Sequence, residues 1–209
     1  MTFGSAVLSF ALVAGLVTVI PGLDTALVLR VAVVDGRRYA YATALGICSG
    51  ALIWGAAAAA GVSVLLTAST LAYTAMRWAG AAYLAYLGAT MLRDAWSKRD
   101  ALVALDQLAT RSWRRSYRRG VLTNLLNPKV GVFFVSFLPG FVPAGHSVGW
   151  ITLGFGLWFA VLTAVYFAVL VAVSTTVASW MSTARIRRRL DALTGLVLVG
   201  FGLRLATEA

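Results

Sequence analysis

Pro21-Gly22-Leu23-Asp24 and Asn127-Pro128-Lys129 are the two stretches that decide the fold, because each one interrupts a long apolar run and carries a charge. The first lies in the run 3–34 and the second in the run 120–142. Proline removes a backbone donor and disrupts a helix. A charged side chain at the centre of a membrane helix costs roughly 2.5–3.5 kcal/mol on insertion scales. Interrupted helices in corresponding halves of a chain are typical of the binding site of a secondary transporter.

The composition indicates an integral membrane protein. Of the 209 residues, 60% are hydrophobic and 12% are charged, whereas soluble domains carry about 25% charged residues. Polar stretches are too short for a separate soluble domain, so we expect one transmembrane domain over residues 1–209. Cys48 is the only cysteine, which excludes a disulfide within the chain.

The apolar runs predict an all-α membrane protein with six transmembrane helices. A hydrocarbon core of about 30 Å needs roughly 20 apolar residues for each helical span. The predicted spans lie near residues 3–34, 40–66, 71–92, 119–142, 148–177 and 190–206. The first is expected to break at Pro21-Gly22 and the fourth at Asn127-Pro128.

Basic residues give the predicted orientation. The loops after the first, third and fifth spans hold fifteen of the 18 Lys and Arg residues, with the largest group in the loop at about 93–118. Cytoplasmic loops carry such an excess, so we expect a multi-pass protein with both termini outside. The +11 net charge is therefore interpreted as a topology signal and a contact with anionic lipids, and not as a nucleic-acid surface.

Two halves with three spans each predict an inverted repeat of about 1–100 and 112–209. An odd number of spans makes the halves cross the membrane in opposite senses. Pro21 precedes Gly46 by 25 residues and Pro128 precedes Gly154 by 26. Small residues allow close helix approach in membranes, which is the expected role of Gly46 and Gly50.

The residues at the breaks have helix-start chemistry. Asn127 is a favoured N-cap and Pro128 is favoured at the first helical position, and Asp24-Thr25 gives the same capping signal after Pro21-Gly22. Each broken span then contains a half-helix that starts inside the membrane. Its free amides favour an anion, and Lys129 adds a full positive charge.

The same breaks also offer groups for a cation. The carbonyls four residues before each proline, those of Val17 and Asn124, lose their usual donors. They can accept hydrogen bonds from an ammonium group, with Asp24 as its counter-ion. A site with both signs suits a zwitterion and hence an amino acid. The candidate site residues for substrate or proton are Gly22, Asp24, Thr25, Asn124, Asn127 and Lys129, with Pro21 and Pro128 as the helix breaks.

Purely structural roles remain open for the same residues. Asp24 can cap a helix and pair with Lys129, and Lys129 can snorkel or pair without touching substrate. Asn124 and Asn127 can serve as cap and packing groups. Asp24 is nevertheless the only carboxylate well inside a predicted span, which makes it the candidate for proton coupling.

Several motifs resemble those of the LysE/RhtB family of bacterial amino-acid exporters. Pro21-Gly22-Leu23-Asp24-Thr25 is similar to the family's Pro-Gly-Pro-Asp-Thr pattern. The run from Trp78 to Gly88 resembles the family's third span. Thr123-Asn124-Leu125-Leu126-Asn127-Pro128-Lys129 and Phe137-Leu138-Pro139-Gly140-Phe141 resemble its fourth. Leu23 in place of the second proline and Gly140 in place of a frequent glutamine are departures that bear on the substrate.

The resemblance implies export of amino acids or their derivatives from the cytoplasm across the bacterial plasma (inner) membrane, by proton antiport with alternating access. Substrates across the family include lysine, arginine, threonine and homoserine. The implied partners are the substrate, protons and membrane lipids, and six short spans leave room for a homodimer contact. No cofactor, no metal and no nucleic acid is expected.

Two other functions stay as alternatives. One is export of an inorganic or metal cation, although the sequence has no His/Cys/Asp cluster that would supply ligands. Another is a non-transporting structural membrane subunit. An enzyme is not expected, because HExxH and paired-carboxylate motifs are absent from the sequence.

Overall fold

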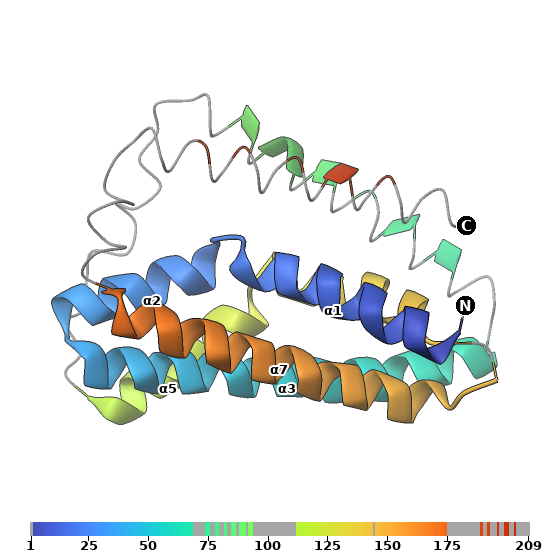
Figure 1. The fold of residues 1–209 in the computed structure, drawn as a ribbon, viewed down its shortest axis with the longest axis horizontal. Coiled ribbons are helices and arrows are strands. Elements are labelled where there is room, and N and C mark those ends of the chain that lie inside the picture. Colours follow the sequence, from blue (N-terminus) through green and yellow to red (C-terminus); the bar gives the residue numbers. More distant parts are fainter. Residues whose placement is uncertain are drawn as a thin grey trace.

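The computed structural model describes residues 2–68, 112–143 and 145–174, with isolated positions between 74 and 93 and between 189 and 203. Over these residues the protein is all-helical, without strands (Figure 1). The first three helices are α1 (Phe3–Val19), α2 (Leu23–Val34) and α3 (Arg37–Ala68). After a gap come α5 (Trp113–Leu125), α6 (Pro128–Val132), the π-helical turn η2 (Phe133–Phe137), the 3-10 turn η3 (Leu138–Phe141) and α7 (Val148–Ala172).

Two helices in the described part of the chain are long and apolar enough to cross a bilayer, residues Arg37–Gly61 of α3 and all of α7. The pair α1 and α2 passes the same test together, with a bend of 48° at the predicted break, and is a third candidate if the bent pair is one span. Large apolar side chains such as Leu12, Trp150 and Val165 are exposed on these helices, as lipid-facing residues would be. The predicted spans near 71–92 and 190–206 are described only at scattered positions, and so are not tested as spans.

A glycine sets the end of α2 and the start of α3. Gly36 has a φ of +102°, which glycine adopts without steric cost. The amides of Asp35 and Gly36 both donate to the carbonyl of Val31, a common way for a helix to end. Arg37 then begins α3, and its guanidinium donates to the carbonyl of Ala172 at the end of α7 over 3.0 Å.

The fourth apolar segment begins earlier than the sequence predicts. Its first helix, α5, starts at Trp113 rather than near residue 119, so the end of the predicted basic loop at 93–118 is helical. Arg114, Arg115 and Arg118 are exposed on α5, whereas Ser116 and Gly120 are buried. The helix extends through the basic stretch because its other face packs on α3.

Glycines let α3 approach both α5 and α7 closely, as predicted for Gly46 and Gly50. A Cβ on Gly46 would overlap the carbonyl oxygen of Tyr117 on α5, and a Cβ on Gly50 would lie 2.7 Å from the side-chain oxygen of Asn124. Farther along, Gly55 meets Gly156 of α7. In Figure 1, α7 lies along α3, and the two helices run in opposite directions.

Two apolar clusters form the core. One joins α1, α3, the η2–η3 region and the first half of α7 through a group of aromatic rings that includes Phe10, Phe133, Phe155 and Phe159. The other joins α2, the start of α3 and the second half of α7 around residues such as Val28 and Phe167. Polar residues of the two helix breaks lie where these clusters meet.

Candidate functional site

The two helix breaks lie against one another, and Lys129 connects them. Lys129 follows the second break, and its Nζ donates to the carbonyls of Val17 and Ile20 at the end of α1, over 3.1 and 3.0 Å. Pro21 has no amide with which to satisfy Val17. The side chain of one interruption therefore pairs backbone groups that the other interruption leaves free.

Asp24 lies in the first turn of α2 and is 8% exposed. Its Oδ2 accepts a hydrogen bond from Asn124 Nδ2 over 2.9 Å. Its Oδ1 has no partner among the described residues. The prediction that Asp24 or Thr25 caps α2 is wrong, because the N-cap is Gly22, without a side-chain hydrogen bond.

The second break has the local chemistry that the sequence predicts. Asn127 is the N-cap of α6, its side chain accepts from the amide of Lys129 over 3.1 Å, and Pro128 takes the first helical position. The carbonyl of Asn124, whose usual donor Pro128 lacks, accepts from the amide of Asn127 over 3.1 Å and from Trp54 Nε1 of α3 over 3.4 Å. Both carbonyls predicted to be open to an ammonium group are thus paired with protein donors in this conformation.

A small cavity lies at the meeting point of the breaks. Its volume is about 20 Å³, which is room for about one water molecule. Five predicted site residues line it: Gly22, Asp24, Thr25, Asn124 and Lys129. Asn127 is not among the described lining residues. Asp24 and Lys129 form no direct ion pair within the described ranges, so each charge faces the cavity with its own partners.

Sequence reasoning missed the wall that α7 contributes. Phe159, Thr163 and Phe167 line the cavity, and their spacing of four places them on one face of the helix. The only sequence signal was a threonine in a strongly apolar span, which is common in membrane helices. Thr25 of α2 also meets α7, with its Oγ1 3.4 Å from the Tyr166 hydroxyl.

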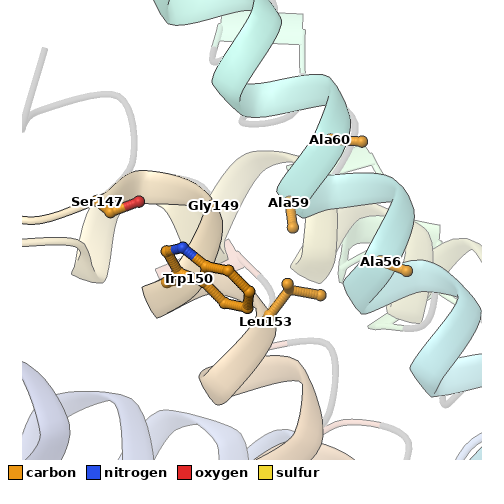
Figure 2. A pocket seen from close by; sticks show the side chains of 7 residues that line it. All are labelled: Ala56, Ala59, Ala60, Ser147, Gly149, Trp150 and Leu153. Carbon is orange, nitrogen blue, oxygen red and sulfur yellow. The ribbon is translucent and has the colours of Figure 1, made fainter.

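A larger hollow has different chemistry. It has a volume of about 360 Å³ and lies between α3 and the start of α7, as Figure 2 shows. Its described lining residues are Ala56, Ala59, Ala60, Ser147, Gly149, Trp150 and Leu153. Because they include no charged side chain, this hollow lacks the groups to recognise a zwitterion. The described residues contain no group of three or more His, Cys, Asp or Glu side chains that could hold a metal ion.

Several known proteins are similar to this chain over most of its length. The threonine efflux protein of Salmonella typhi is 31% identical over 88% of this chain and 89% of its own length. The leucine efflux protein of Klebsiella pneumoniae is 28% identical over 96% and 94%. A membrane protein of Bacillus subtilis is 28% identical over 94% and 96%. No solved structure matches the chain.

The family comparison covers nearly the whole chain. The sequence profile of the family described as LysE type translocator matches residues 13–209, a range that includes both helix breaks and all the cavity-lining residues named above. Together with the apolar helices, this makes the chain an integral membrane protein. It belongs to the LysE type translocator family, a family of transporters and not of enzymes.

Proposed function

We propose that this protein exports small amino acids or their derivatives from the cytoplasm in exchange for protons. The observation that carries the proposal is a buried cavity, between two helix breaks, that Asp24 and Lys129 both line without a direct ion pair between them in the described part of the chain. An acidic and a basic group on one cavity suit a zwitterion. The threonine and leucine efflux proteins among its relatives support an amino-acid substrate.

Each charged residue has a proposed role. The unpartnered Oδ1 of Asp24 binds the substrate ammonium in one stage of the cycle and a proton in another. Lys129 binds the substrate carboxylate. When Lys129 turns toward the carboxylate, the carbonyls of Val17 and Ile20 become available to the substrate ammonium. The substrate ammonium then replaces Lys129 as the donor to these carbonyls. The replacement is needed because an unsatisfied backbone group inside a bilayer costs several kcal/mol.

Transport further requires a change of shape, since a cavity of about 20 Å³ is too small for any amino acid. We propose alternating access by six spans in two inverted repeats, 1–100 and 112–209, which rock around the breaks. The opposite directions of α3 and α7 and the close approach of Gly55 to Gly156 support this arrangement.

Orientation and surroundings complete the proposal. Both termini lie outside the bacterial inner membrane and the basic loops lie in the cytoplasm. The exposed arginines of α5 support a contact with anionic headgroups. A homodimer would be formed through lipid-facing helices.

The test uses purified protein in lipid vesicles with an imposed pH gradient. Labelled threonine, homoserine, leucine and lysine are followed separately. We expect the wild type to move at least one of them against its concentration gradient, and D24N to fall to the level of empty vesicles while it remains inserted. Asp35→Asn is the matched control, because it makes the same chemical change on Asp35, which follows α2 at its other end. Wild-type transport by D24N would refute the coupling role of Asp24.

A further inference from the structure

We infer that Thr163 of α7 recognises the substrate side chain and that the protein prefers substrates with a side-chain hydroxyl, such as threonine, over equally shaped apolar ones. The inference rests on the proposed function and names the substrate class of the same site. It starts from the hydroxyl of Thr163, which lines the cavity, is 4% exposed and has no hydrogen-bond partner in the described part of the chain.

Several other hydroxyls in these helices are paired, whereas those of Ser116 and Thr152 are buried without a partner in the described part of the chain but do not line the cavity as Thr163 does. Thr18, Thr43 and Ser49 each donate to the carbonyl four residues before them, over 2.7, 3.0 and 3.0 Å. That bond is the usual one for a hydroxyl in an apolar helix. A buried hydroxyl without a partner is costly, so the free hydroxyl of Thr163 at a cavity indicates a ligand group that pairs with it.

The surroundings of Thr163 fit the side chain of a small amino acid. Phe159 and Phe167 lie one turn to either side and are buried, which gives apolar walls around a single polar point. Two other described residues that line this cavity carry an unpartnered buried side-chain oxygen, Asp24 Oδ1 on α2 and Asn124 Oδ1 on α5. A substrate held at its charged end by Asp24 and Lys129 would direct its side chain toward α7.

This arrangement favours a substrate whose side chain carries a hydroxyl. A site built to hydrogen-bond a hydroxyl discriminates against the analogue without it, because the buried partner is then left unpaired. Threonine and valine are the sharpest pair for a test, since they have nearly the same shape and differ by a hydroxyl in place of a methyl group.

The experiment measures proton-driven transport of labelled threonine and of labelled valine in the same vesicle preparation. We expect the wild type to favour threonine, and Thr163→Val to lower the threonine-to-valine ratio by roughly three- to tenfold, as expected for one lost hydrogen bond. Thr163→Ser keeps the hydroxyl and should retain the ratio. Thr152→Val is the matched control: Thr152 is also on α7, fully buried and unpartnered in the described part of the chain, but it is not among the cavity-lining residues.

The outcomes separate this inference from the proposed function. If the wild type transports no amino acid, the proposed function fails and the inference with it. If the wild type transports both substrates and Thr163→Val leaves their ratio unchanged, or slows both equally as loss of a structural water would, only the inference is overturned. Should Thr163→Val fail to insert, Thr163→Ala removes the same hydroxyl without adding a methyl group and gives the same reading.

Discussion

Both helix breaks leave backbone carbonyls without their usual helical donors, but different groups pair the carbonyls at each break. At the first break, Gly22 begins α2 without a side-chain cap, and the carbonyls of Val17 and Ile20 are paired by Lys129 from far along the chain. At the second, Asn127 caps its own helix, and the carbonyl of Asn124 accepts from the Asn127 amide and from Trp54 of α3. The first break thus depends on its counterpart, and the second depends on local chemistry and on α3.

This difference bears on which break opens during transport. A charged side chain that holds two carbonyls can exchange them for a substrate carboxylate. A cap two residues away in sequence has no such alternative partner. We therefore expect the first break to change its hydrogen bonds during transport and the second to keep them. The predictions below test this contrast, from the largest expected effect to the smallest.

Lys129→Met should have the largest effect. It removes the proposed carboxylate ligand and leaves the carbonyls of Val17 and Ile20 without their donor, so we expect amino-acid transport to fall to background. Hydrogen–deuterium exchange should rise in a peptide that spans residues 13–24 and stay nearly unchanged in one that spans 120–127. Faster exchange at both breaks would contradict the contrast between them.

Lys129→Arg serves as the matched control, because it keeps the charge and the donors but changes their geometry. We expect slow exchange at residues 13–24 to be largely retained and transport to be partly retained. A methionine variant that transports like the wild type would remove Lys129 from the mechanism.

Asn127→Ala should have an intermediate effect, on stability more than on transport. Loss of an N-cap costs about 1 kcal/mol, which corresponds to a fall in Tm of roughly 2–4 °C for a chain of this size. Asn127→Ser keeps an acceptor and should lie close to the wild type. The measurement is thermal unfolding in detergent, and an equal loss in both variants would show that the cap is not the stabilising feature.

Trp54→Phe should have the smallest effect. It removes a long hydrogen bond of 3.4 Å to the carbonyl of Asn124 while it retains an aromatic ring next to Gly131. We expect a loss of transport of less than about fivefold, because one neutral hydrogen bond contributes about 1 kcal/mol or less. Trp158→Phe, at an exposed position on α7, should leave the rate unchanged, and a loss as large as that of Lys129→Met would reverse the assigned roles of the two breaks.

The part of the cavity lining that the two breaks contribute could be predicted from the sequence, because Asp24, Asn124 and Lys129 are polar residues close to prolines in apolar runs. The N-cap at Asn127 was also predictable, because capping is local. The N-cap at Gly22 could not be predicted. Aspartate and threonine are more favoured N-cap residues than glycine, but α2 begins at Leu23, directly after Pro21-Gly22. The helical start of α5 was not predicted, because its arginines were interpreted as part of a basic loop. They lie instead on the exposed face of a helix whose other face packs on α3.

The sequence by itself determined that the chain is a helical membrane protein and where its helices break, because hydrophobicity, missing amides and cap residues act over a few neighbouring positions. Only the tertiary structure decided that Lys129 would pair with the end of α1, that Asn124 would hold Asp24, and that Thr163 would face the cavity with a free hydroxyl. These contacts join residues about 35 to 140 positions apart. They depend on how closely glycines such as Gly46 and Gly120 let the helices approach, which no local pattern fixes.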